Sequence, residues 1–166
     1  YEVANERIKY WYDEDQFNSI FRLKEAIERT VPNRSDYRLF FLCAFSNILK
    51  GASRWLTKSI KPQIDPKKIP SDVISAFKEQ IKFMMDANKE SDANGGSQTE
   101  IVTANFLDEM INKPKVDMIV TSPPYVTSYE YADLHQLSSL WLGYASDYRE
   151  LREGSIGSRY HQYNFE

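Results

Sequence analysis

The sequence DMIVTSPPY at residues 117–125 joins an apolar run to two consecutive prolines. The apolar run, Met118–Val120, has the composition of a short buried strand. Each proline fixes its own φ at about −65° and lacks an N–H group, and Pro123 also holds Ser122 in an extended conformation. We therefore expect a strand that leads directly into a stiff turn whose carbonyl groups have no competing donors.

This turn is suited to hold a planar base. The two hydrogens of an exocyclic amino group can be accepted by Ser122 Oγ and by the Pro123 carbonyl, while Tyr125 stacks on the ring. Three alternatives stay open: a proline turn that closes a strand, a Ser-Pro phosphorylation site, and a ligand for a WW domain. The last fits poorly, because a PPxY ligand needs its tyrosine one position later.

The tetrapeptide Ser-Pro-Pro-Tyr resembles the catalytic (D/N/S)PP(Y/F/W) motif of amino-group DNA methyltransferases, which use S-adenosylmethionine to methylate N4 of cytosine or N6 of adenine. The resemblance implies a DNA methyltransferase whose catalytic residues are Ser122, Pro123, Pro124 and Tyr125, with no metal and no strong general base. The variant TSPPY is most similar to the N4-cytosine group. Such enzymes rotate the target nucleotide out of double-stranded DNA.

A βαβ unit is predicted around this motif. Residues 99–104 and 116–121 are apolar enough for strands, and residues 106–112 between them suit a helix, whose crossover makes the strands parallel. We therefore expect an α/β fold, a partial Rossmann-like methyltransferase sheet with a mainly helical N-terminal portion. Asn105 and Ser122 would then lie together at the carboxyl ends of the two strands, where ligands bind in such sheets.

Cofactor contacts follow from the resemblance. In the family, the third strand leads to a residue near the adenine ring of S-adenosylmethionine, and the fourth leads to the Pro-Pro motif. This implies that Asn105, Thr121 and Asp108 contact the cofactor, although Asp108 can equally be a charge at a helix N-terminus. The chain contains no Phe-x-Gly-x-Gly loop, which in the family holds the methionine part of the cofactor.

The missing glycine loop predicts that the chain is an excised piece of a longer protein. The chain also starts at Tyr1 without a methionine. We expect the rest of the same polypeptide to carry the loop, upstream in preference to downstream, and the chain alone to bind S-adenosylmethionine weakly or not at all.

The chain divides into three predicted regions: a helical region at 1–93 (an insertion or a target-recognition unit), a linker at 94–98, and the partial catalytic core at 99–166. Apolar spacing and caps predict several helices. These are one within 6–31 that ends near Thr30, one from Ser35 or Asp36 to Gly51, one from Ser71 through Met85, one over 131–142 that ends at Gly143, and one or two turns over 147–153.

A basic stretch runs from Lys50 to Lys68 in a chain whose net charge is −3. It holds six basic side chains and a single acidic one, and it predicts phosphate contacts with double-stranded DNA through Arg54, Lys58 and Lys61. Trp55 in the same stretch would suit stacking on a base. An ordinary solvated helix end and loop is the equal alternative, and core packing is the alternative for Trp55.

Composition sets the remaining limits. A chain of 166 residues with 42% apolar content can form one sizeable core. It has no apolar run of the about 20 residues that span a bilayer, and no signal-peptide pattern. Cys43 lies in an apolar run, so we expect a buried, inert thiol and a reducing cytoplasm. No metal site is expected, and oligomeric state is left open.

Two other functions compete with DNA methylation. Similar Pro-Pro-aromatic turns serve RNA or protein amide methyltransferases, and nothing in the sequence separates these from the DNA enzymes. The second is a noncatalytic nucleic-acid-binding or assembly module with a degenerate methyltransferase core, whose helices form the working surface. The missing glycine loop favours this second alternative. The recognition sequence and any partner restriction enzyme are not predicted.

Overall fold

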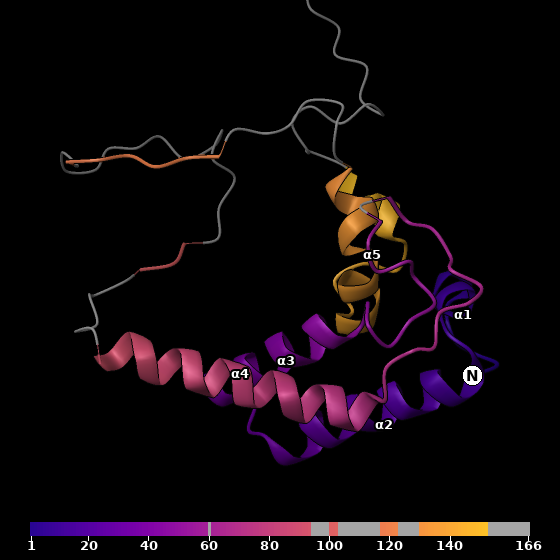
Figure 1. The fold of residues 1–166 in the computed structure, drawn as a ribbon, viewed down its shortest axis with the longest axis horizontal. Coiled ribbons are helices and arrows are strands. Elements are labelled where there is room, and N and C mark those ends of the chain that lie inside the picture. Colours follow the sequence, from indigo (N-terminus) through magenta and orange to yellow (C-terminus); the bar gives the residue numbers. More distant parts are fainter. Residues whose placement is uncertain (60, 94–99, 103–116, 123–129, 153–166) are drawn as a thin grey trace, which may run out of the picture.

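Helices form the body of the chain in the computed structural model, which describes residues 1–59, 61–93, 100–102, 117–122 and 130–152 (Figure 1). The helical elements in chain order are α1 (Glu6–Trp11), α2 (Glu14–Thr30), α3 (Asp36–Ile48), α4 (Val73–Ala93), α5 (Tyr131–Leu142) and the 3₁₀ helix η1 (Tyr148–Arg152). In Figure 1, α2 and α4 run along the horizontal direction of the view, and α5 stands upright beside them.

The helix predicted within residues 6–31 is divided into two. The chain leaves α1 at Tyr12, whose backbone is extended, and α2 begins after Asp13. The Asp13 carboxylate accepts a hydrogen bond of 2.9 Å from the backbone N–H of Gln16, and such an N-cap stabilises a helix by about 1 kcal/mol. The predicted end at Thr30 is confirmed.

Trp141 on α5 is the centre of the hydrophobic core. Its ring lies 5.2 Å from that of Phe17 on α2 and 6.2 Å from that of Phe45 on α3, and the ring of Tyr12 meets it edge-on at 5.8 Å. The buried face of α2 consists of residues three or four apart, Phe17, Ile20, Leu23 and Ile27. The core thus joins the N-terminal helices to α5, far apart in the sequence.

Helix α3 buries one face, although its sequence is apolar on more than one. Its N-cap is Ser35, one of the two predicted alternatives, and its buried residues are Ala44, Phe45 and Ile48. Cys43 is exposed, which corrects the expectation of a buried thiol. The reason is geometric: a helix packed against α2, α4 and α5 on one side leaves the opposite residues in solvent.

Helix α4 is longer than the sequence predicts. Asp72 caps its first turn by accepting from the backbone N–H of Ser75 at 2.8 Å, and Val73 is buried at its start. The helix continues past Met85 to Ala93. Phe83, one of the apolar residues of this helix, is 69% exposed. The predicted linker at 94–98 lies outside the described residues.

The predicted α/β fold is wrong for the part of the chain that the structure describes. Residues 100–102 and 117–122 form no strand, and Met118, Ile119 and Val120 are 78 to 88% exposed. Apolar composition favours a strand only when a partner strand supplies hydrogen bonds and a covered face. Among the described residues, the one β pairing is an isolated antiparallel bridge between Trp55 and Ile64.

The C-terminal helices agree with the sequence. Helix α5 ends at Gly143, whose φ of 74° is the left-handed conformation that favours glycine. The short helix η1 occupies the predicted positions. The rest of the predicted catalytic core, residues 103–116, 123–129 and 153–166, lies outside the described residues.

Candidate functional site

The predicted catalytic motif is described only at its first residues. Thr121 and Ser122 are exposed, at the end of the segment 117–122, which forms no helix or strand. Pro123, Pro124 and Tyr125 lie outside the described residues, as do Asn105 and Asp108. The proximity of Asn105 to Ser122 and the cofactor role of Thr121 therefore stay predictions.

Helix α5, which follows the motif in the sequence, packs into the helical body. Helix α5 begins at Tyr131, and its buried residues Leu137 and Trp141 belong to the core. The helix also contacts η1, and a side-chain hydrogen bond of 2.7 Å between Ser138 and Ser46 joins it to α3. Helix α5 is therefore anchored in the core.

Two cations of the basic stretch have structural roles. A guanidinium nitrogen of Arg54 donates to the carbonyls of Lys9 and Tyr10, at 3.2 and 2.7 Å, and so ties the stretch to α1. Lys68 Nζ donates to the carbonyls of Lys50 and Trp55, each at 2.8 Å. Burial, followed by the nearby charge of Lys50, lowers the pKa of Lys68. Both cations are therefore engaged within the chain.

Lys58 and Lys61 differ from these two cations. Both side chains are exposed, and neither makes an ion pair with any described residue. They lie in the loop closed by the bridge between Trp55 and Ile64. Of the predicted phosphate contacts, these two are the exposed ones, whereas Arg54 is half-buried.

Trp55 is a core residue in this structure. Its side chain is 1% exposed and stacks on Trp11, with ring centroids 4.8 Å apart and planes 17° apart. Lys50 Nζ lies 5.2 Å from the ring centroid. Because its rings are covered, Trp55 fits the core-packing alternative, and stacking on a base would require the core to open.

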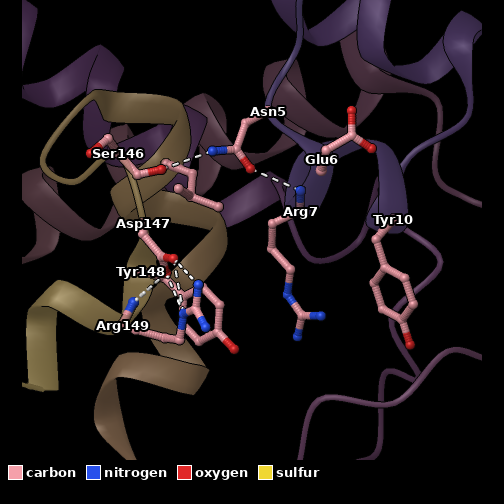
Figure 2. Close-up of a pocket in the computed structure, with 9 residues that line it drawn as sticks. Asn5, Glu6, Arg7, Tyr10, Ser146, Asp147, Tyr148 and Arg149 are labelled. Atoms are coloured by element: carbon pink, nitrogen blue, oxygen red, sulfur yellow. Dashed lines mark hydrogen bonds and ion pairs between the residues drawn. The ribbon is translucent and has the colours of Figure 1, made fainter.

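A cavity of about 580 Å³ lies where α1 meets the end of α5 and η1 (Figure 2). Its lining residues are Asn5, Glu6, Arg7, Tyr10, Leu140, Ser146, Asp147, Tyr148 and Arg149. Asn5 joins the two sides, because its Nδ2 donates to the Ser146 carbonyl at 2.8 Å and its Oδ1 accepts from the Arg7 backbone N–H.

Arg7 is held in this cavity by neutral groups. Its guanidinium carbon lies 4.8 Å from the ring centroid of Tyr10 and 5.2 Å from that of Tyr148, and Figure 2 shows it between these two side chains. Its Nε donates to Gln136 Oε1 at 2.6 Å. Gln136 is fully buried, and its Oε1 also accepts from Trp11 Nε1 at 2.9 Å. The amide orients the cation without neutralising it.

The second cation of the cavity is neutralised. Arg149 Nε donates to both carboxylate oxygens of Asp147 at 2.9 Å, and its Nη2 pairs with the same group. These hydrogen bonds from Arg149 lower the pKa of Asp147 to about 2. The carboxylate of Glu6 is likewise paired with Lys9 at 2.8 Å. Arg7 therefore supplies the uncompensated charge among the described lining residues.

This cavity was not predicted from the sequence. Arg7 and Tyr148 are separated by most of the chain, and neither belongs to a recognised motif. The one local indication was the arginine and aromatic composition of both segments, Arg7 to Trp11 and Tyr148 to Arg152, which is common on ordinary helices.

No family model, no curated protein and no solved structure matches the chain. Within the described ranges, no group of His, Cys, Asp and Glu side chains is arranged to hold a metal ion. No helix among the same residues has the length and apolar character needed to cross a membrane.

Proposed function

We propose that this chain is part of an S-adenosylmethionine-dependent DNA methyltransferase that modifies an exocyclic amino group. The expected target is N4 of cytosine, and N6 of adenine is the alternative target. The supporting observation is the Ser-Pro-Pro-Tyr tetrapeptide at residues 122–125. Its first residue, Ser122, is exposed and precedes a helix anchored in the core. An acceptor that solvent can reach is what recognition of an amino group requires.

Thr121 is the one described residue among those that the sequence assigned to the cofactor. Thr121 and Ser122 lie on an exposed segment without strand partners, and the cavity that contains Arg7 is lined by neither of them. We therefore propose that Thr121 contacts the cofactor only together with parts of the protein beyond the described residues, and we derive no step that passes through the cofactor.

The role of this chain is to hold the base. A nucleotide rotated out of the duplex has lost its stacking and pairing, at a cost of a few kcal/mol. Ser122 Oγ and the Pro123 carbonyl would accept the two amino hydrogens, and Tyr125 would stack on the ring, which recovers about 1 to 3 kcal/mol. Acceptors on both amino hydrogens also free the nitrogen lone pair for reaction.

Duplex DNA would be held by the exposed lysines of the basic stretch. Lys58 and Lys61 have no carboxylate partner among the described residues, so both charges are available to phosphates. A noncatalytic nucleic-acid-binding module is the second candidate, because residues 100–102 and 117–122 lack the sheet that surrounds this motif in the methyltransferases.

Mass spectrometry of nucleosides tests the proposal. DNA is incubated with the full-length natural protein and S-adenosylmethionine, then digested and analysed for N4-methylcytosine and N6-methyladenine. We expect N4-methylcytosine, and a large decrease in its rate of formation for Ser122→Ala. Ser19→Ala is the matched control, because Ser19 is an exposed serine on α2 whose hydroxyl bonds only to the Asp15 carbonyl.

The possible outcomes separate the candidates. Formation of N6-methyladenine without N4-methylcytosine would show that adenine is the target base. Methylated RNA or a methylated protein amide, with unmodified DNA, would reassign the substrate to one of the competing methyltransferase classes. DNA binding without transfer of a methyl group to any of these substrates would favour the noncatalytic module.

A further inference from the structure

Arg7 is an exception among the arginines near the cavity. Arg152 is 16% exposed and pairs with Asp133 at 2.7 Å, and Arg149 pairs with Asp147. Arg7 is also half-buried, yet its guanidinium makes no ion pair with any described residue. Removing a cation from water without a counter-charge is unfavourable, so partly buried arginines are normally paired.

The orientation of Arg7 leaves its terminal nitrogens available. Gln136 occupies Nε, and the rings of Tyr10, Trp11 and Tyr148 lie within 4.8 to 5.2 Å of the guanidinium carbon. Neither Nη atom donates to a described residue, and neither is a buried unsatisfied atom. The guanidinium edge that binds phosphate in a bidentate manner is therefore open.

We propose that this cavity binds a nucleotide, with its phosphate on the Nη atoms of Arg7 and its base against Tyr10. The cavity volume, about 580 Å³, is within the range of small-ligand sites. Tyr10 is 46% exposed, so its ring is accessible for stacking. The same chemistry fits a free mononucleotide and a nucleotide within a single DNA strand.

The site is independent of the proposed methyl transfer. It is built by α1, the end of α5 and η1, and it contains none of residues 121–125. Binding can be measured without S-adenosylmethionine. A failure to bind nucleotide would therefore leave the methylation proposal intact, and an inactive Ser-Pro-Pro-Tyr motif would leave nucleotide binding intact.

Calorimetry with three probes tests the proposal on the whole chain. The probes are deoxycytidine 5′-monophosphate, deoxycytidine, and a short single-stranded oligodeoxynucleotide. We expect the monophosphate or the oligonucleotide to bind, and deoxycytidine to bind much more weakly because it lacks the anion. Binding of the monophosphate identifies a free nucleotide as a ligand, and binding of the oligonucleotide alone identifies a strand phosphate.

Two variants examine the two contacts. Arg7→Gln should weaken binding roughly 10- to 100-fold, the effect of losing a hydrogen bond to a charged group, and Arg22→Gln is the control because Arg22 is an exposed arginine on α2. Tyr10→Ala should weaken binding roughly 5- to 150-fold through lost stacking. Tyr37→Ala, at a 74% exposed tyrosine on α3, is its control.

Asp147→Asn keeps the test decisive if Arg7→Gln fails to fold. The asparagine side-chain oxygen can still accept from the Arg149 backbone N–H, which Asp147 Oδ1 does at 2.9 Å, so the start of η1 is retained. The substitution removes the counter-charge of Arg149 and leaves a second cation free in the cavity. We expect tighter binding of the phosphate probe, by several-fold at low salt.

Three results would each overturn the nucleotide site. One is equal affinity for deoxycytidine and its monophosphate, because the phosphate would then contribute nothing. Another is unchanged or weakened binding in Asp147→Asn. The third is the same loss of binding in Arg22→Gln as in Arg7→Gln, since this would reflect only the total charge of the protein.

Discussion

The indole rings of Trp11 and Trp55 stack with their centroids 4.8 Å apart and their planes 17° apart. The contact joins α1 to the start of the basic loop, and the two side chains are 0% and 1% exposed. It places Trp55 in the core of the N-terminal helices, so the loop that carries Lys58 and Lys61 is attached to a rigid base.

Trp55→Ala should lower the free energy of unfolding by about 3 to 5 kcal/mol, the usual cost of truncating a buried aromatic side chain. Urea denaturation followed by circular dichroism measures it. Lys58→Ala, at an exposed residue of the same loop, should change stability by no more than about 0.5 kcal/mol. Unchanged stability in Trp55→Ala, together with lost DNA binding, would instead support the role that the sequence suggested for Trp55, stacking on a base.

Gln136→Leu should also destabilise the protein strongly. Gln136 Oε1 accepts from Arg7 Nε and Trp11 Nε1, so its replacement leaves a half-buried cation and a buried indole N–H without an acceptor. We expect a loss of about 2 to 5 kcal/mol in the free energy of unfolding. His135→Ala on the neighbouring exposed position of α5 is the control. An equal effect of the two changes would show that the amide is not needed.

Local and non-local features explain what the sequence could predict. Ser35 and Gly143 limit α3 and α5 through hydrogen bonds and backbone angles within a few residues, and both were predicted. The pairing of strands depends on distant segments, so the apolar run at 118–120 alone did not determine it. Trp55 was misleading for a related reason: its lysine neighbours indicated solvent, whereas its contact with Trp11 is made across 44 residues.

The cavity at Arg7 depends on the same kind of distant contact. Gln136 and Tyr148 reach Arg7 only after α5 has packed across the N-terminal helices. The absence of a carboxylate beside Arg7 is likewise a property of the folded chain, because acidic residues are frequent in the sequence around it. No spacing rule for a motif could have indicated this site.

Tyr12 should make the fold sensitive to alkali. Burial raises the pKa of its hydroxyl well above the usual value of 10, while the hydroxyl donates to the Leu49 carbonyl at 2.9 Å. A raised folded pKa means that stability is complete below pH 10 and is lost above it, as the unfolded tyrosine ionises, by about 1.4 kcal/mol per pH unit. Tyr12→Phe should flatten this alkaline slope in urea titrations, and Tyr37→Phe should retain it.

The Asp147 carboxyl group should titrate with a low midpoint because of its pairing with Arg149. The pKa of Asp147 is about 2 because Arg149 donates to its carboxylate, against an ordinary value of 3.8. A depressed folded pKa gives stability that is present above pH 4 and is lost as the pH falls toward 2. The pair is largely exposed, so the effect on stability is small. Carboxyl NMR titration should give a midpoint near 2, and Arg149→Gln should raise it toward 3.8.

The double substitution Lys58→Ala and Lys61→Ala should weaken binding to duplex DNA and reduce its salt dependence. If each lysine contacts one phosphate, the slope of log affinity against log salt should fall in magnitude by about 1.8, because each contact contributes about 0.9. Lys78→Ala with Lys82→Ala is the matched control, since it removes the same charge from exposed positions on α4. Fluorescence anisotropy across about 50 to 200 mM salt provides both slopes. Equal losses in the two double variants would mean that only net charge matters, and unchanged affinity in the first would assign Lys58 and Lys61 to the solvated surface.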